Sequence, residues 1–355
     1  MLNQHRLAQL TDLMTGSGWE LLLLYGHTWR KDFFRCLLNV NFSGPHAVAA
    51  VRPSGEVLVI VSDPWDAEMI AAFAEVSVAS DLAPALNRFG NVRAAGIAGM
   101  ELMEARFVEA VPNPVSATFA VEELRRGKTA GEIAAMRKAA ELSDRGYQYF
   151  AGIIETGMKE YELVAEVEAF LKGNGAEDNF MLIASGGTEV TGMKPPTARE
   201  FRAGDCVTTE LTPQVDGYWA QICRTLVLGE PSAKQKQSFA IFDEARKAAE
   251  DFLKPGVNIA DVARVQNDVF RKHGFGEYTG AKYTRVRGHG LGLHCDENPY
   301  VLEDVNYSVK EGMTLIAHPN TYLPLAGYMV LGDSLLVTAG GCAPLNHTER
   351  KLFQK

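Results

Sequence analysis

Residues 202–231 read RAGDCVTTELTPQVDGYWAQICRTLVLGEP, and this stretch decides how the rest of the chain is interpreted. Its many Val, Thr, Leu and Ile residues predict short strands. A carboxylate, Glu210, and an amide, Gln221, stand among these residues. Because a buried carboxylate without a partner is unstable, Glu210 either forms a structural ion pair, for example with Arg224, or belongs to a functional site.

The segments on either side of this stretch have the pattern of an α+β protein. Apolar residues recur at helical spacing in 132–154 and 156–175 before it, and in 231–253 and 259–273 after it. The last stretch, 283–345, predicts strands and loops rich in Gly and Pro. Separate runs of strands and helices indicate the α+β class.

The first third of the chain predicts a separate, smaller α/β domain. A proline-bearing connection at 111–128 leads out of it, and we place the domain boundary between residues 122 and 123. The expected elements are a helix at 3–16, a strand at 19–25, a hairpin at 47–61, a helix at 63–76 that begins at Asp63 with Pro64 in its first turn, and a strand at 92–99.

Composition excludes several classes of protein. The 355 residues carry a net charge of −9 and no stripe of Lys and Arg, which argues against nucleic-acid binding. No apolar run approaches the roughly 18 residues of a membrane helix, and the N-terminus has no signal-peptide core. The five scattered cysteines include no CxxC pair, so we expect free thiols in a cytoplasmic protein.

Six segments between residues 123 and 355 resemble, in order, the motifs of the creatinase, prolidase and aminopeptidase P family. Each motif is weak alone, but six in the right order are specific. The resemblance implies a C-terminal pita-bread catalytic domain, 123–355, preceded by a smaller creatinase-type α/β domain, 1–122. The segments are RRGKTAGEIAAMRKAAEL, ETGMKEYEL, the opening stretch, RGHGLGLHCDENPY, VKEGMTLIAHPNTYLP and GDSLLVTAGGCAPL.

The chain departs from this family at the residues that would hold two metal ions. The family's two aspartate positions correspond to Glu210 and Gln221, and its histidine ligand corresponds to His289. The two glutamate positions correspond to His318 and Gly332. Both bridging carboxylates are thus missing, and two cations about 4 Å apart would repel each other strongly without them. The resemblance further places Asp296 and Met193 at two positions where the family has histidines.

We therefore expect no cofactor and no dinuclear metal site. A single metal ion remains an alternative, because Glu210, His289 and His318 form a set of two histidines and one carboxylate. In the family framework, however, the positions of Glu210 and His289 serve different ions, so one shared ion would require a local rearrangement.

Creatinase, which resembles this chain and has no catalytic metal, suggests the leading hypothesis. The chain would be a metal-independent hydrolase that cleaves a C–N bond of a small, nitrogen-containing, carboxylated compound. Glu210, His289 and His318 would form the catalytic centre, since imidazoles transfer protons near neutral pH and a carboxylate binds a cation or acts as a nucleophile. Gln221 would orient the substrate. Creatinase uses a histidine as its base at the position of Met193, so its mechanism does not transfer directly.

Further residues are candidates for substrate binding, each with a structural alternative. His294 and Asp296 belong either to the site or to a polar loop, and Tyr218 and Trp219 either form its wall or pack in the core. The resemblance implies a homodimer in which Arg30 or Arg35 of one N-terminal domain covers the partner's pocket and binds a substrate carboxylate. Otherwise these arginines form a solvated basic loop.

Two other functions remain open. One is a mononuclear-metal peptidase of the Xaa-Pro type, or a lyase, that uses Glu210, His289 and His318 as ligands. The other is a non-catalytic module that binds a small molecule or a peptide. Metal content and turnover distinguish these alternatives from the leading hypothesis.

Overall fold

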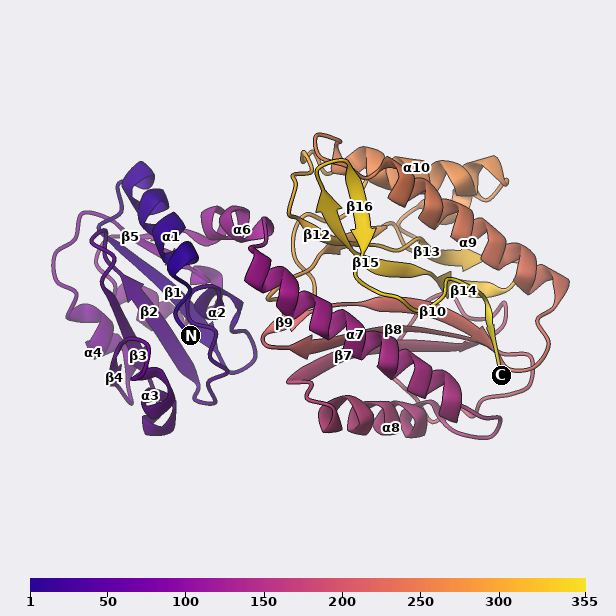
Figure 1. The fold of residues 1–355 in the computed structure, drawn as a ribbon, viewed down its shortest axis with the longest axis horizontal. Helices are drawn as coiled ribbons and strands as arrows, with labels where there is room; N and C mark the ends of the chain where they lie inside the picture. The colour runs from indigo at the N-terminus through magenta and orange to yellow at the C-terminus, as the bar shows by residue number, and fades with distance from the viewer. The chain divides into compact units, whose positions relative to one another are not determined.

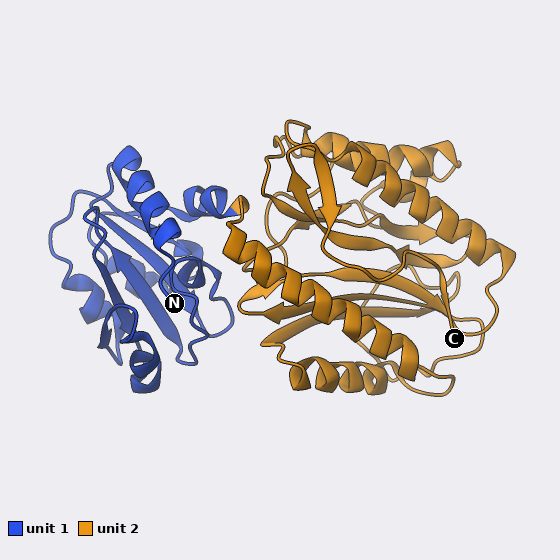
Figure 2. Cartoon of the chain, in the orientation of Figure 1, with its two compact units in different colours: residues 1–125 blue, residues 126–355 orange.

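The computed structural model describes residues 1–355, which divide into two compact units, Met1–Arg125 and Arg126–Lys355 (Figure 2). The division falls near the end of helix α6, which spans Thr118–Arg126. It lies three residues beyond the boundary expected from the sequence.

The first unit is built on a six-stranded mixed sheet with the strand order β4-β3-β2-β1-β5-β6. Helices and short turns flank this sheet (Figure 1). The strands are β1 (Leu21–His27), β2 (His46–Val51), β3 (Val57–Val61), β4 (Glu75–Val78), β5 (Ala95–Ala98) and β6 (Pro114–Ser116). The helices are α1 (Gln4–Ser17), α2 (Asp32–Leu37), α3 (Pro64–Ile70), α4 (Leu82–Asn87), η1 (Met100–Leu102), α5 (Ala105–Glu109) and α6.

Local signals in the sequence explain most of these elements, with one correction. β2 and β3 form the expected antiparallel hairpin, and the Asp63 side chain caps α3 by accepting a hydrogen bond from the backbone N–H of Trp65. The prediction that this helix continues to residue 76 was wrong. It ends at Ile70, because residues 75–78 instead pair in parallel with β3 as the edge strand β4.

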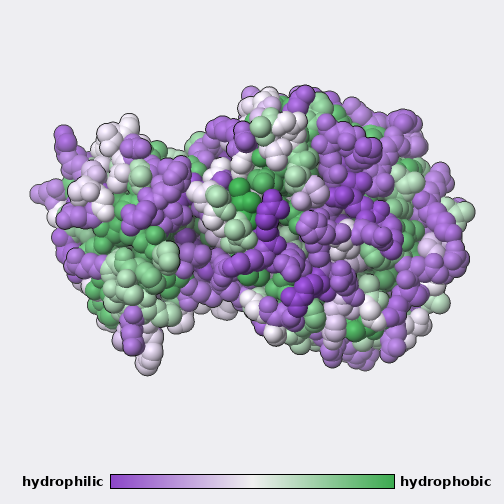
Figure 3. Space-filling view, in the orientation of Figure 1, coloured by the Kyte–Doolittle hydropathy of each residue, from purple (hydrophilic) through white to green (hydrophobic).

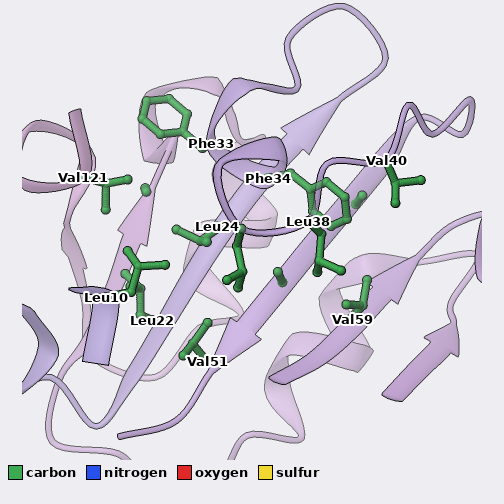
Figure 4. Packing of buried hydrophobic residues seen from close by; sticks show 14 of the residues in the cluster. Leu10, Leu22, Leu24, Phe33, Phe34, Leu38, Val40, Val51, Val59 and Val121 are labelled. Carbon is green, nitrogen blue, oxygen red and sulfur yellow. The ribbon is translucent and has the colours of Figure 1, made fainter. Parts of the chain in front are cut away.

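The core of the first unit lies on both faces of its sheet. On one face, Leu22 and Leu24 of β1 pack with Leu10 of α1 and with Phe33 and Phe34 of α2 (Figure 4). The alternate residues of the same strand contribute to a second cluster on the opposite face. This burial on both sides explains the continuous apolar run of β1.

The second unit is built on a nine-stranded sheet that is antiparallel apart from one short strand. Its main path runs β11-β12-β15-β10-β8-β7, and a separate hairpin pairs β13 with β14. The strands are β7 (Asp178–Gly186), β8 (Cys206–Val215), β9 (Tyr218–Trp219), β10 (Ile222–Val227), β11 (Gly288–Gly290), β12 (Thr314–Ala317), β13 (Asn320–Leu323), β14 (Gly327–Val330), β15 (Gly332–Thr338), β16 (Gly341–Pro344) and β17 (Phe353–Gln354).

Four long helices accompany this sheet (Figure 1). α7 (Ala130–Ile153) and α8 (Glu160–Gly173) pack with the β7, β8 and β10 part, whereas α9 (Ala233–Phe252) and α10 (Ile259–Lys272) pack with the β12, β15 and β16 part. A short 3-10 helix, η2 (Gly276–Thr279), follows α10. The four helices match the periodic segments of the sequence and confirm the α+β class.

The surface of the second unit and the five cysteines agree with what the composition predicts. No helix combines the length and apolar character needed to cross a membrane. Hydrophilic residues predominate on the face of the second unit seen in Figure 3, with apolar residues in scattered groups. All five cysteines are free thiols, as expected.

A candidate active site in the second unit

A cavity of about 600 Å³ in the second unit brings together six of the ten candidate site residues. These six come from four separate parts of the sequence, so only the fold makes them neighbours. They are Glu210, Gln221, His289, His294, Asp296 and His318. Met193, which stands where the resemblance implies a substrate-facing histidine, also lines the cavity.

Strand pairing places Glu210 in a row of residues that crosses the sheet. Glu210 of β8 lies opposite Leu182 of β7 on one side and Cys223 of β10 on the other. Cys223 in turn lies opposite Gly332 of β15. Because side chains alternate between faces along a strand, Gln221 points to the same side of the sheet as Cys223 and Glu210.

Glu210 is a buried carboxyl that makes no hydrogen bond or ion pair, and it is only 7% exposed. The structural alternative, a pair with Arg224, is wrong. The Arg224 guanidinium instead binds Asp333 at 2.6 Å, and both side chains are fully buried. Burial raises the pKa of Glu210 to about 7, and the nearby negative charge of Asp296 raises it further in the same direction. A substantial fraction of Glu210 is therefore protonated at neutral pH.

His289 is held in one tautomer by its own strand. Its Nδ1 lies 2.9 Å from the carbonyl oxygen of Gly290. Since a carbonyl only accepts hydrogen bonds, Nδ1 carries the proton, and the lone pair of Nε2 remains free to accept one. Asp296 lies 3.5 Å from the same Nδ1. Burial lowers the pKa of His289, and the Asp296 charge opposes this effect, so the imidazole is neutral at neutral pH.

The glycine before His289 lets β11 approach its neighbouring strand closely. Gly288 has a φ of 141°, in the region that favours glycine. A Cβ atom there would lie 2.0 Å from the carbonyl oxygen of Ile316 in β12. The Gly-His-Gly sequence therefore fixes where His289 enters the cavity.

His318 follows directly after β12 and is the second imidazole of the site. It is 3% exposed, and neither of its ring nitrogens has a hydrogen-bond partner. Its ring lies edge-on to that of His289, with centroids 5.4 Å apart and an angle of 71° between the planes. Burial, followed by the proximity of His289, lowers the pKa of His318 to about 3. His318 is thus a neutral hydrogen-bonding group, because it is too weak a base to take a proton at neutral pH.

Gln221 is fixed at both its backbone and its side chain. Its backbone N–H donates to the Ser334 hydroxyl at 2.8 Å, and its side-chain amide donates to the Cys223 sulfur at 3.4 Å. This arrangement leaves the side-chain oxygen as an acceptor for a bound group.

Four of the candidate residues lie outside this cavity lining. Tyr218 and Trp219 form β9 and pair with Val215 and Gln214 of β8. Arg30 and Arg35 belong to the first unit, where they bind Asp32 at 3.0 Å and Asn39 at 2.8 Å, respectively. The role expected for these arginines, covering the pocket of a partner subunit and binding a substrate carboxylate there, stays a prediction.

The sequence did not reveal the aromatic part of the cavity wall. Three tyrosines from different loops and strands line it, together with Phe180. Tyr283 packs face to face on Tyr322, with ring centroids 5.5 Å apart. No sequence spacing connects these residues, although the Tyr300 that ends the motif RGHGLGLHCDENPY was a usable signal. The three are Tyr283, Tyr300 and Tyr328.

The residues present do not fit the metal ions of the related family. Nowhere do three His, Cys, Asp or Glu side chains come together in a group that could hold an ion. At Gly332, where the family has a bridging glutamate, a Cβ atom would lie 2.6 Å from the Cβ of His318 and 2.8 Å from the carbonyl oxygen of Ala317. His318 thus occupies the space that a side chain at residue 332 requires.

Comparisons with known proteins agree with the fold and with the order of the motifs. Residues 134–339 match Metallopeptidase family M24. A Xaa-Pro dipeptidase of Pyrococcus furiosus is 32% identical over 235 residues, which cover 66% of this chain and 66% of that protein. The matched segment thus spans just under two thirds of the relative.

Two solved structures are similar over nearly their whole length. The prolidase from Pyrococcus furiosus superimposes with a TM-score of 0.82 at 25% identity, covering 96% of this chain and 99% of that one. The X-Pro aminopeptidase from Thermotoga maritima gives a TM-score of 0.87 at 22% identity, covering 98% and 99%. These similarities confirm the expected pita-bread fold with its smaller N-terminal domain.

Proposed function

Because the chain belongs to metallopeptidase family M24 but lacks a fitting set of metal ligands, we propose that it is a hydrolase that cleaves a C–N bond without a metal ion. The substrate is a small, nitrogen-containing, carboxylated compound. One observation carries this proposal. Glu210 and His289 line the same cavity, and their surroundings shift their pKa values in opposite directions, up for the acid and down for the imidazole. Such opposed shifts assign an acid and a base.

His289 is the general base. Its Nε2 lone pair takes a proton from a water molecule while the water oxygen forms a bond to the carbon of the C–N group. The imidazolium that results is stabilised through Nδ1, which faces the Gly290 carbonyl at 2.9 Å and the Asp296 carboxylate at 3.5 Å. This arrangement matches the way that an acidic residue orients and stabilises a catalytic histidine in hydrolases.

Glu210 is the general acid. In its protonated form it donates its proton to the departing nitrogen as the C–N bond breaks, so that the nitrogen leaves as a neutral amine. Glu210 then carries a negative charge and His289 a positive one, and the proton returns from His289 to Glu210 through water. A carboxylic acid with a pKa near 7 suits this role, because it is both partly protonated and acidic enough at neutral pH.

His318 and Gln221 orient the substrate. The unpartnered ring N–H of His318 donates to the oxygen or nitrogen on which negative charge develops, and a donor aimed at developing charge accelerates a reaction strongly. The side-chain oxygen of Gln221 accepts from an N–H of the substrate. Both groups remain neutral throughout, so they add no proton transfer of their own.

The substrate's nitrogen end faces this site. The cavity lining contains Glu210 and Asp296 but no Lys or Arg, so the carboxylate of the substrate needs a cation from elsewhere. Arg30 or Arg35 of a second copy remains the predicted source, which requires the homodimer expected from the sequence. The solved relatives are called prolidase and X-Pro aminopeptidase, and a proline peptide is therefore one compound class to test.

A substrate screen with matched variants tests the proposal. The chelator-treated protein is incubated with amidino compounds, cyclic amides and Xaa-Pro dipeptides, and the amine released is measured. We expect turnover of at least one class, its loss in His289→Asn, and no change in Lys138→Met, which removes an exposed ion pair with Asp216. Full activity of His289→Asn would contradict the assignment. Tight binding of a compound without turnover over hours would instead indicate the non-catalytic module.

A further inference from the structure

The loop Gly292–Glu297 carries three residues of the cavity, His294, Cys295 and Asp296, yet it has no helix or strand to fix it. The His289 imidazole depends on this loop, because Asp296 is the carboxylate beside its Nδ1. The contacts that hold the loop therefore decide whether this carboxylate stays in place.

A buried ion pair closes the loop. Lys128 Nζ lies 3.2 Å from Glu297 Oε2, and the two side chains are only 4% and 6% exposed. The other carboxylate oxygen of Glu297 accepts a hydrogen bond from the backbone N–H of His294 at 3.2 Å. The Glu297 carboxylate thus joins the middle of the loop, at His294, to a lysine that lies more than 160 residues earlier in the chain.

A glycine, Gly292, lies against this ion pair. A Cβ atom on Gly292 would lie 2.8 Å from the Glu297 carboxylate and 2.9 Å from Lys128 Nζ, so a larger residue there would displace the paired side chains. Lys128 is itself held by its backbone N–H, which donates to the carbonyl oxygen of Gly312 at 2.9 Å. The pair therefore rests on a fixed part of the unit.

The same pair connects to His289 through backbone bonds. Glu297 and Gly290 exchange two backbone hydrogen bonds of 2.9 and 2.7 Å. Within the loop, the backbone N–H of Asp296 donates to His294 Nδ1 at 3.2 Å. Movement of Glu297 would therefore displace both Asp296 and the strand end next to His289.

We infer that Lys128 and Glu297 are a positioning pair that holds the 292–297 loop closed and keeps the Asp296 carboxylate against His289. Neither residue lines the cavity, so they act through the loop and not on the substrate. The geometric part of this inference stands on its own. Only its consequence for turnover rests on the function proposed above.

Cys295 provides a direct probe of the loop, because it lies between His294 and Asp296 and is partly exposed. The full-length protein is treated with iodoacetamide, and the alkylation rate of each cysteine is measured by peptide mass spectrometry. In Lys128→Met and in Glu297→Gln, we expect Cys295 to react at least about tenfold faster, since a buried charge that loses its partner opens the structure around it. Cys342, a partly exposed thiol outside the loop, should react at the wild-type rate.

Two controls separate a local effect from general unfolding. Lys138→Met removes an exposed ion pair with Asp216 and should leave every rate unchanged. The buried thiols Cys206 and Cys223 react only if the unit unfolds. Should the single variants unfold, Lys128→Met/Glu297→Met removes both charges and leaves neither unpaired. It should restore slow labelling of Cys206 and Cys223 but not of Cys295, because the bond to the His294 N–H is still missing.

Cys295 rates within twofold of wild type in folded single variants, or in the folded double variant, would overturn the inference. With a substrate from the screen, the folded variants should lose kcat more than they change KM, since the pair supports a group that acts in the transition state. If the loop opens but turnover is unchanged, the role assigned to Asp296 is contradicted. The inference that Lys128 and Glu297 hold the loop closed would still stand. Absence of turnover in the wild type would contradict only the proposed function.

Discussion

Replacing Glu210 with Gln should change how the stability of the protein depends on pH. The folded-state pKa of Glu210 is about 7, against an ordinary value of 4.5. The folded protein therefore binds a proton at this site more tightly than the unfolded chain does. Stability from this group is fully present below pH 4.5 and is lost as the pH rises through 7.

The size of this effect follows from the two pKa values. Each pKa unit corresponds to about 1.4 kcal/mol, so the wild type should lose about 3 kcal/mol between pH 4.5 and pH 8 because Glu210 must ionise while buried. Gln has a similar shape and never ionises, so Glu210→Gln should not show this loss. Groups that do not interact with Glu210 titrate equally in both proteins and cancel in the difference.

Urea unfolding followed by circular dichroism at pH 5 and pH 8 measures this difference. We expect Glu210→Gln to gain about 2.5 kcal/mol relative to the wild type between pH 5 and pH 8, by the same linkage. Glu349→Gln, which alters a carboxyl that is 70% exposed, serves as the matched control and should follow the wild type. A difference between wild type and Glu210→Gln that stays constant from pH 5 to pH 8 would refute the raised pKa and the acid role built on it.

Three further predictions concern activity and the former metal position. The pH profile of kcat/KM should be bell-shaped. On the acid side, below pH 6.5, kcat/KM should increase with increasing pH as His289 loses its proton, and above pH 7 it should fall about tenfold per pH unit as Glu210 ionises. A profile that is flat from pH 7 to 9 would contradict this. His289→Asn should lower kcat by about 10²- to 10⁴-fold with a melting temperature close to that of the wild type, whereas an equal loss in both would indicate a structural role. Gly332→Ala should destabilise the protein by about 1–3 kcal/mol in urea unfolding, because its Cβ would lie 2.6 Å from that of His318, and a neutral effect would mean that His318 moves freely.

The sequence predicted the fold, and it also predicted that the central candidate residues lie close together, as the cavity shows. Strand residues such as Glu210 and His289 have positions that are set by pairing register, and register follows from the apolar pattern and the turns between strands. Gln221, His294, Asp296 and His318 lie outside the strands, and they were grouped with Glu210 and His289 through the order of the family motifs along the chain.

What the sequence left undetermined depends on packing between distant segments. Arg224 was a reasonable partner for Glu210 by proximity along the chain, yet Asp333 from β15 takes it at 2.6 Å. The tyrosines of the cavity wall come from distant parts of the chain, and so do Lys128 and Glu297. No regular spacing in the sequence connects these residues. The end of α3 also depends on a tertiary effect, since pairing with β3 outweighs the helical pattern at Glu75.

The measurement that tests the central claim most directly is the metal content of the purified protein. Expression in medium that contains Mn, Fe, Co and Zn, followed by elemental analysis before and after chelation, gives ions per chain. Because the donor set at Glu210, Gln221, His289, His318 and Gly332 lacks both bridging carboxylates, we expect less than about a tenth of an ion per chain and unchanged turnover after chelation. Near one or two ions per chain, removed by chelator together with activity, would contradict the account.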